Sequence, residues 1–491
     1  MIILTNIFFY TYIASIFIIS LYCSTQLVHL FYYLKNKSKS FENDLNNDEK
    51  HLPFITIQLP IFNEKYVIET LVESITKLDY PKDKFEIHIL DDSTDETTTI
   101  AQRAVQFYSQ RGYNIKLFHR NDRDGFKAGA LRDATPFSNG EFLVIFDADF
   151  IPYPDFLKKT LPSFNQENIG VVQTRWDHLN QNSSLLTELQ AFQLNVHFTV
   201  EQSGRYKAGH FLQFNGTAGI WRKSCIIDSG GWQADTLTED LDLSYRAQLK
   251  EWEIVYLEGV TVPAELPSDI YGLKSQQFRW MKGGAENAKK LLRLIWLSQL
   301  NIIVKVTASL HLLSSSVFLF VFLLSISSVC LVFSNNFLEE STIYLEFFFF
   351  PTFILMSTYF IANVLSSRPN ESIISKILKF VILFPTYMSM SMAMGLNNSV
   401  AVIQGLLGKK SSFVRTPKTG FDLKKDKQTN FDYNTSKIGV LTIIEGILSL
   451  IILAAVIKAF FNGHFDFLLI HLMLTFGYSY LFILSIRSDS K

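Results

Sequence analysis

Cysteine is scarce in this chain, and its scarcity excludes two classes of fold. Only Cys23, Cys225 and Cys330 occur among 491 residues. A disulfide framework or a zinc site needs closely set groups of cysteine, and these three are far apart. We therefore expect a fold that depends on neither.

An excess of charge of one sign is also lacking. The 45 basic residues balance 46 acidic ones, so the formal net charge is -1. Proteins that bind nucleic acid carry a clear basic excess, and we expect no nucleic acid partner here. The balance averages two unlike regions, because 48% of the residues are apolar while residues 36–300 hold most of the charge.

Long apolar runs make up the second region. Each has about the ~20 residues that cross a bilayer, and they cover residues 2–34, 304–333, 344–365, 437–460 and 464–487. The first run is longer than the apolar core of a signal peptide, and no small-residue cleavage site precedes Lys35. We interpret it as an anchor, with a cleaved signal peptide as the alternative.

The basic residues around these runs predict which side of the membrane each segment faces. Lys35, Lys37 and Lys39 follow the first run, whereas the loop 334–343 has no basic residue. Eight basic residues lie in a later segment, namely Lys409, Lys410, Arg415, Lys418, Lys424, Lys425, Lys427 and Lys437. Because basic flanks stay in the cytoplasm, we expect the domain 36–300 and the segment 408–436 to be cytoplasmic.

The stretch 379–407 is apolar enough to be a sixth span. If it crossed once, the basic segment after it would lie outside the cell, against the positive-inside bias. The stretch also contains Pro385, Asn397 and Asn398. We predict a helix that lies in the cytoplasmic interface or re-enters it, and a crossing helix is the alternative.

Strands alternate with helices in the charged region. The apolar patterns predict strands over 54–60, 85–90, 114–118 and 142–146, and helices over 69–77 and 94–110. This alternation predicts a mainly parallel sheet with helices on both faces. Ligands of such sheets bind at the carboxyl ends of the strands.

Aspartates follow two of these strands. Asp91 and Asp92 come after the second strand, and Asp147 and Asp149 after the fourth. Two carboxylates two residues apart can approach one divalent cation that also binds a diphosphate. Turn formation and helix capping explain most such aspartates, so Asp147 and Asp149 alone leave both interpretations open.

Two other segments suit a nucleotide-sugar. Lys127 lies in 123–130, where glycines and a cation precede a helix that can receive a diphosphate. Phe62 and Glu64 follow the first strand, where a ring can stack on a nucleobase and a carboxylate can bind it. An ordinary turn and an ordinary loop are the alternatives.

The last two motifs suit an acceptor. Glu239 and Asp240 begin an amphipathic helix, where Asp240 can cap the helix or take a proton from a sugar hydroxyl. Gln276, Arg279 and Trp280 lie before the next apolar run. Trp and Arg occur there as interfacial anchors, but Trp280 can also support a sugar ring and Arg279 can neutralise a diphosphate.

In this order the motifs resemble those of the processive, inverting family-two glycosyltransferases. The family includes cellulose, hyaluronan and chitin synthases, and the resemblance is strongest to the plant cellulose-synthase-like group that makes mannan and xyloglucan backbones. It covers about residues 50–300 and includes 172–176, 214–219 and 264–267. It implies an α/β, GT-A (Rossmann-like) cytoplasmic catalytic domain beside a helical transmembrane bundle.

The resemblance also implies roles for single residues. Asp92 would contact the nucleotide with support from Asp91, Asp147 the diphosphate, and Asp149 a Mg²⁺ or Mn²⁺ ion together with Asp147. Asp240, beside Glu239, would be the catalytic base, while Gln276, Arg279 and Trp280 would line the acceptor end and the diphosphate. Phe413, Thr416 and Lys418 are similar to a Phe-x-Val-Thr-x-Lys gating loop, although Arg415 stands where that pattern has Val.

We therefore expect an integral membrane enzyme that uses a nucleotide-diphospho-sugar of the UDP-glucose or GDP-mannose type. It would elongate a β-linked polysaccharide and export it, with membrane lipids around it. A glycolipid synthase with a lipid acceptor is the alternative. A non-catalytic transporter or scaffold is a further alternative, and the intact motifs argue against it. Only residues 485–491 follow the last span and they form no regulatory domain, so we expect that regulation of the enzyme would need an accessory chain. A bacterial inner membrane suits the single-chain layout.

Overall fold

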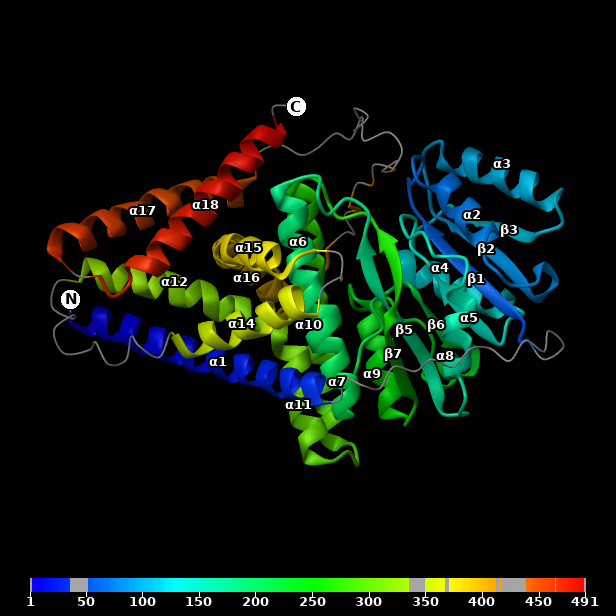
Figure 1. Cartoon of the computed structure of the whole chain (residues 1–491), viewed down its shortest axis with the longest axis horizontal. Coiled ribbons are helices and arrows are strands. Elements are labelled where there is room, and N and C mark those ends of the chain that lie inside the picture. Colours follow the sequence, from blue (N-terminus) through cyan, green and yellow to red (C-terminus); the bar gives the residue numbers. More distant parts are fainter. Residues whose placement is uncertain are drawn as a thin grey trace.

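The computed structural model describes residues 2–35, 52–334, 349–366, 371–411, 415, 416, 418, 420, 439–463 and 465–489. Figure 1 shows a helix-covered sheet on one side and long helices on the other. The segment 36–51, most of the loop 334–343, Phe413 and the stretch 421–438 lie outside the described residues. The expectations made for them stay predictions.

A seven-stranded sheet forms the core of the charged region. Its strands are β1 (Ile55–Ile61), β2 (Phe85–Asp91), β3 (Asn114–His119), β4 (Phe142–Ile145), β5 (Ile169–His178), β6 (Gly219–Arg222) and β7 (Glu253–Ala264). Their order across the sheet is β3-β2-β1-β4-β6-β5-β7. β1 to β4 are mutually parallel, as are β5 and β7, whereas β6 is antiparallel to both of its neighbours.

The central strands are continuous apolar runs because both faces of the sheet are covered. One face packs on α2 (Ile68–Thr76) and α3 (Thr97–Ser109), with side chains such as Ile57 and Ile87 fully buried. The other packs on α4 (Phe126–Ala134), α6 (Leu185–Val196), α8 (Lys223–Asp228) and α9 (Glu239–Leu249), with Leu143 and Ile145 fully buried. Helix α5 (Phe156–Thr160) adds Phe156 to the first face.

The four predicted strands and the two predicted helices are confirmed as β1 to β4, α2 and α3, and the sheet is mainly parallel as expected. β5, β6 and β7 were not predicted. β6 has only four residues and begins with Gly219, so it is too short to show a two-residue periodicity.

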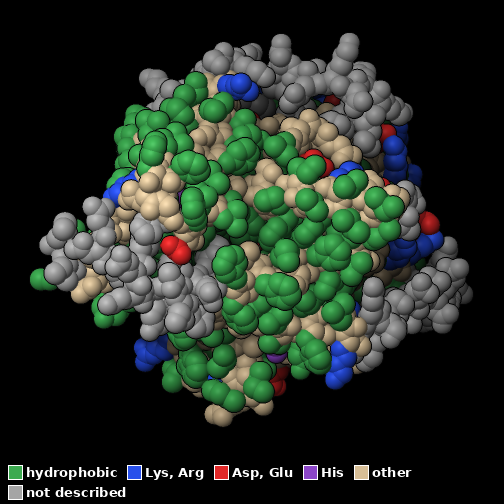
Figure 2. Space-filling model, turned by 60° about the vertical axis from the view of Figure 1, so that its left-hand side comes forward, with side chains coloured by type: hydrophobic (Ala, Val, Ile, Leu, Met, Phe, Trp, Pro, Cys, Tyr) green, Lys and Arg blue, Asp and Glu red, His purple; other side chains and the backbone are tan. Residues whose placement is uncertain are grey.

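Long helices form the second region. They are α1 (Ile2–Lys35), α10 (Ile270–Leu297), α11 (Ile302–Leu312), α12 (Val317–Phe333), α14 (Phe349–Phe360), α15 (Ile373–Ala393), α16 (Gly395–Leu406), α17 (Val440–Asn462) and α18 (Leu468–Asp489). By length and composition, five described helical stretches can cross a membrane: Ile3–Lys35, Ile302–Phe333, Ile373–Ala393, Val440–Asn462 and Leu468–Ser488. Figure 2 shows a broad apolar surface over this region, as contact with lipid requires.

Two expected spans differ from single long helices. The stretch expected over 304–333 is divided by a 3₁₀ turn, Leu313–Ser316, and Figure 1 shows α11 and α12 pointing in different directions. In the stretch expected over 344–365, the described part is α14 with a π-helical turn, Ile361–Leu365, which together make a shorter apolar helix than the five above.

Helix α15 covers the first half of the stretch 379–407, for which both an interfacial and a crossing helix were considered. Figure 1 looks nearly along α15, whereas α1 and α12 lie across the view. One side of α15 exposes Leu378, Val381 and Ile382, while Phe384 and Tyr387 are buried. This direction and this one-sided exposure favour the predicted interfacial helix, while the length of α15 also suits a span, so its placement stays a prediction.

Helix α1 packs closely on the domain that contains the sheet. A Cβ atom added to Gly204 of α7 (Gln202–Ala208) would collide with the carbonyl oxygen of His29. Gln26 of α1 donates a hydrogen bond to Glu201, 2.9 Å away. Only glycine permits so close an approach of two backbones. The predicted anchor is therefore also a packing partner of the domain that it anchors.

Helix α10 joins the two regions. The Lys274 ammonium lies 2.6 Å from the Glu445 carboxylate of α17, and this carboxylate is fully buried. On the other side, α16 lies so close that a Cβ added to Gly405 would be 2.7 Å from the carbonyl oxygen of Lys282. The helix that carries Gln276, Arg279 and Trp280 is thus held from both sides.

Candidate active site

The aspartates after β2 are held by neighbouring side chains. Asp91 is fully buried, accepts a hydrogen bond from Thr98 Oγ1 (2.6 Å) and lies 2.9 Å from His119 Nδ1. Asp92 forms a two-point ion pair with Arg120, at 2.8 and 2.6 Å. Asp91 therefore holds the end of β2 in place. Asp92 comes after it and faces Arg120, as expected if Asp91 supports Asp92.

Phe62 lies at the end of β1 with one face covered. The Arg123 guanidinium carbon lies 3.2 Å from the centroid of the Phe62 ring. A flat cation on an aromatic ring is a favourable contact. The ring that the sequence predicts to stack on a nucleobase thus stacks on a guanidinium in this structure.

Lys127 brings two other predicted residues together. Its ammonium forms an ion pair with Asp147 and donates a hydrogen bond to the carbonyl oxygen of Gly216, 2.9 Å away. Gly216 has a φ of 79°, and a Cβ added to it would lie 3.1 Å from Asp240 Oδ2 and 3.6 Å from Lys127 Nζ. Lys127, Asp147 and Asp240 therefore meet around one glycine.

Asp149 lies deeper than Asp147 and holds a lysine. Its carboxylate accepts a hydrogen bond from the backbone N–H of Glu265 (3.1 Å) and from Lys418 Nζ (2.7 Å). Burial raises the pKa of Asp149, although Lys418 opposes the shift. The structure thus separates the two aspartates that the sequence places together, with a different ammonium on each.

These residues fit a divalent cation only in part. No group of three or more His, Cys, Asp and Glu that could hold a metal occurs among the described residues. Mg²⁺ usually takes one or two protein carboxylates and completes its shell with phosphate oxygens and water. Asp147 and Asp149 match that pattern, and the ammonium on each shows that the place attracts positive charge.

Asp240 and Glu239 lie in the first turn of α9, as predicted. Asp240 Oδ1 accepts a hydrogen bond from the backbone N–H of Leu241, 2.9 Å away. Burial raises the pKa of Asp240 to about 7, and the charge of Glu239 adds to the shift. Burial also raises the pKa of Glu239. A general base with a pKa near 7 is well matched to proton transfer at neutral pH.

Gln276, Arg279 and Trp280 share one face of α10, because residues three and four apart on a helix are neighbours. Arg279 donates a hydrogen bond to Thr416 Oγ1, 3.0 Å away. Burial lowers the pKa of Arg279 to about 10, while Asp147 and Glu239 act to raise it. Arg279 therefore adds a positive charge beside the carboxylates, and Gln276 is half-buried in the same turn.

The segment after α16 reaches the strand ends. Arg415 forms a two-point ion pair with Glu64 (2.9 and 2.5 Å), and Lys418 pairs with Asp149. Burial raises the pKa of Glu64 to about 7 although Arg415 lowers it. The sequence predicts that Thr416 and Lys418 come to the site, and the structure brings them there. The Arg415 contact was not predicted, and its only signal was a departure from the family pattern.

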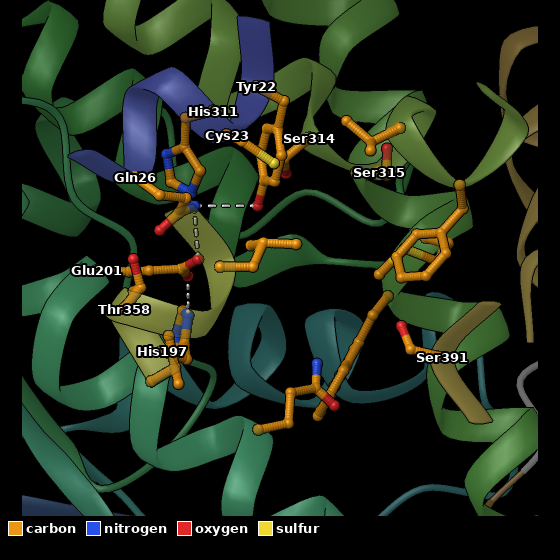
Figure 3. Close-up of a pocket in the computed structure, with 18 of the residues that line it drawn as sticks. Tyr22, Cys23, Gln26, His197, Glu201, His311, Ser314, Ser315, Thr358 and Ser391 are labelled. Atoms are coloured by element: carbon orange, nitrogen blue, oxygen red, sulfur yellow. Dashed lines mark hydrogen bonds and ion pairs between the residues drawn. The ribbon is translucent and has the colours of Figure 1, made fainter. Parts of the chain in front are cut away.

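A cavity of about 360 Å³ begins at the predicted acceptor residues. Asp240 and Trp280 line it, and it continues between the long helices, past Gln26 of α1, Val321 of α12, Leu355 of α14 and Met388 of α15. Figure 3 shows Gln26, Glu201 and His197 along one side of it. The sequence did not predict these three, because nothing in a single sequence indicates that they meet.

A family model and several named relatives match this region. The model "Glycosyltransferase like family 2" matches residues 53–283. A glucomannan 4-beta-mannosyltransferase 2 of Arabidopsis thaliana is 40% identical over 275 residues, which are 54% of this chain and 51% of the relative. A probable glucomannan 4-beta-mannosyltransferase 6 of Oryza sativa subsp. japonica is 39% identical over 255 residues, 51% and 44% of the two chains.

The chain thus spans about half the length of the relatives that it matches. Among solved structures, the mannosyltransferase PcManGT from Pyrobaculum calidifontis, in complex with GDP-Man and Mn²⁺, has a TM-score of 0.52 at 18% identity. The match covers 81% of this chain and 100% of that one. At this identity the likeness concerns the fold alone. Residues 53–283 thus match a family 2 glycosyltransferase model, and the fold is GT-A-like.

Proposed function

We propose that this chain is a membrane-embedded, inverting hexosyltransferase. It transfers a sugar from a nucleotide-diphospho-sugar to the end of a β-linked glycan and passes the growing glycan across the membrane. The observation that supports this best is the cavity that Asp240 and Trp280 share with α1, α12, α14 and α15. A site that only modified small soluble acceptors would not need a cavity that continues between membrane helices.

The donor would bind at the carboxyl ends of β1, β2 and β4. Asp92 lies where it can contact the nucleoside, while Lys127 and Arg279 bring positive charge to the diphosphate. Asp147 and Asp149 would hold the divalent cation, which when bound neutralises charge that develops on the leaving diphosphate. Fixed positive groups at such a point often contribute more to the rate of an enzyme than any other single effect.

Asp240 would act as the base. Its carboxylate takes the proton of the acceptor hydroxyl as the hydroxyl oxygen attacks the anomeric carbon. The bond from that carbon to the diphosphate oxygen breaks, and the nucleoside diphosphate leaves with the electron pair. Attack from the opposite side inverts the anomeric carbon, so an α-linked donor gives a β-linked product.

A screen of donors tests this proposal. The names of the relatives favour a mannosyl donor, so GDP-mannose is the first donor to examine and UDP-glucose the second. We expect purified full-length chain in lipid nanodiscs to release nucleoside diphosphate from one of them and to incorporate its radiolabelled sugar into material that a glycosidase degrades. Label recovered only in an organic-solvent extract would identify the alternative, a glycolipid synthase.

The proposed orientation puts the catalytic domain and the segment after α16 on the cytoplasmic side. Lys410 is exposed at the start of that segment. In a chain without its native cysteines, Lys410→Cys should resist an impermeant thiol reagent in sealed cells and react after permeabilisation. Labelling in sealed cells would mean that α15 crosses the bilayer.

A further inference from the structure

A chain of hydrogen bonds runs along one wall of the cavity. Gln26 Nε2 donates to Glu201 Oε1 (2.9 Å) and to the Tyr22 hydroxyl (3.2 Å). Glu201 Oε2 lies 3.0 Å from His197 Nδ1, and His197 Nε2 lies 3.0 Å from Asn215 Oδ1. Figure 3 shows the part from Tyr22 to His197 beside the open space.

This wall begins next to the reacting centre and leads away from it. Asn215 precedes Gly216, whose carbonyl oxygen accepts a hydrogen bond from Lys127 and whose missing side chain would point at Asp240. The other end of the wall is Gln26, which belongs to the membrane helix α1. Asn215, Gln26 and the two residues between them all line the cavity.

Two buried polar atoms at the ends of this wall lack a hydrogen-bond partner among the described residues. They are Gln26 Oε1, on a residue 2% exposed, and Asn215 Nδ2, on a residue 9% exposed. Buried polar atoms without partners are rare and destabilising. One is an acceptor and the other a donor, so a hydroxyl group, which both donates and accepts, can satisfy either.

The carboxylate between them remains ionised. Burial acts to raise the pKa of Glu201, but the hydrogen bond and charge of His197 and the charge of Arg205 lower it to about 2. The Glu201 side chain is 20% exposed, so it can still accept from a ligand in the cavity. A charge-assisted hydrogen bond of this kind is about twice as strong as a neutral one.

Aromatic rings from several other elements line the same cavity, and two of them are large indole rings near its start. The two indole rings are those of Trp280 of α10 and Trp176 of β5. A pyranose has apolar C–H faces, which pack on aromatic rings, and polar hydroxyl edges, which need donors and acceptors. An acyl chain matches the rings but leaves the carboxylate and the two unpartnered atoms unsatisfied.

From these contacts we propose that Gln26, Glu201, His197 and Asn215 form a saccharide subsite. It binds the hydroxyl groups of an acceptor sugar beyond the one that reacts. The proposal rests on the proposed function, because the subsite belongs to the acceptor of that reaction. It adds that the membrane helix α1 contributes directly to acceptor affinity.

Direct binding tests the subsite without a donor. Full-length chain in nanodiscs is titrated with β-1,4-mannohexaose and with cellohexaose. Glu201→Gln keeps the size of the side chain and removes its charge, and we expect the affinity for the hexaose that binds wild type to fall about ten- to hundredfold.

Glu258→Gln is the matched control. The Glu258 carboxylate accepts a hydrogen bond from Ser203 (2.6 Å), and Glu258 does not line the cavity. The control should bind the hexaose as wild type does. Gln26→Leu is a second test variant, which removes the unpartnered oxygen from α1, and thermal unfolding shows which variants remain folded.

The outcomes separate the subsite from the proposed reaction. Equal hexaose affinity in wild type and both folded test variants overturns the subsite, even if polymer is made. Failure of wild type to bind either hexaose also overturns the subsite. Water would then be the hydrogen-bond partner of the two unpartnered atoms. Weakened binding in the test variants, with no turnover of any nucleotide-sugar by wild type, supports the subsite and refutes the reaction.

Discussion

The strand ends and the start of the cavity hold their carboxylates in opposite ways. At the strand ends each carboxylate has a cation from the chain itself: Glu64 with Arg415, Asp92 with Arg120, Asp147 with Lys127 and Asp149 with Lys418. At the cavity, neither Glu239 nor Asp240 forms an ion pair within the described parts of the chain, and burial raises the pKa of both. Burial also raises the pKa of the paired Glu64 and Asp149, so the difference lies in the cation. A paired carboxylate can exchange its cation for another, whereas a carboxylate without a cation can take a proton from a ligand.

The largest expected effect is on the unpaired side. Asp240→Asn should lower the rate of transfer by about 10²–10⁴, the usual contribution of general acid–base catalysis, because an amide cannot accept the proton. Donor affinity, measured by calorimetry, should change little. Asp235→Asn, an exposed residue that pairs with Lys290, is the control and should keep full activity. Near-normal transfer by folded Asp240→Asn would assign the base elsewhere.

Among the paired carboxylates, removal of Asp149 should affect the binding of the nucleotide. Asp149→Ala removes a carboxylate that we expect to hold the metal, so nucleotide affinity in the presence of Mn²⁺ should fall about ten- to hundredfold. Without metal, the variant and wild type should differ much less. A chelator should stop turnover of the wild type, and Mg²⁺ or Mn²⁺ should restore it. Full activity in excess chelator would show that no divalent cation is needed.

The pH dependence should follow the unpaired side. As the proposed base, Asp240 would work only when deprotonated, and burial together with the charge of Glu239 raises its pKa to about 7. With saturating substrates, kcat should therefore be constant above pH 7 and fall about tenfold for each pH unit below it. Glu64, whose pKa is also about 7, should affect the donor KM instead. A kcat that is constant from pH 8 to pH 5 would contradict the assignment of Asp240.

The smallest expected effect is a gain of metal affinity, where most substitutions cause a loss. The Lys418 ammonium forms an ion pair with the Asp149 carboxylate, so a metal that binds Asp149 must displace the ammonium. Lys418→Ala should bind Mn²⁺ about two- to fivefold more tightly without nucleotide, since a single ion pair contributes up to about 1 kcal/mol. Electron paramagnetic resonance of Mn²⁺ measures this, with exposed Lys410→Ala as control. Weaker or unchanged Mn²⁺ binding would mean that Lys418 does not compete with the metal.

The donor half of the site could be predicted from the sequence because local patterns determine it. β1, β2 and β4 are continuous apolar runs, and parallel strands bring their carboxyl ends to one edge. Asp92, Asp147 and Asp149 therefore had to come near one another. The separate depths of Asp147 and Asp149, and the lysine on each, depend on side-chain packing that no periodicity records.

The cavity half could not be predicted in the same way. Gln26 and Glu201 are 175 residues apart and meet only because α1 packs against the domain. Arg415 and Glu64 are 351 residues apart, and their ion pair has no local signal. Polar residues on a membrane helix indicate function in general, but the partner of each becomes visible only in the folded chain.

The close contact of Gly204 with His29 bears on how the protein is assembled. During synthesis α1 emerges about 170 residues before α7, so it enters the membrane while the surface that will cover it does not yet exist. The catalytic domain then completes its fold against a helix that is already inserted. A domain expressed from residue 52 onward would lack the partner of α7 and one wall of the cavity. We expect such a fragment to misfold or aggregate, and a catalytically competent soluble form would have to keep α1 or replace its surface.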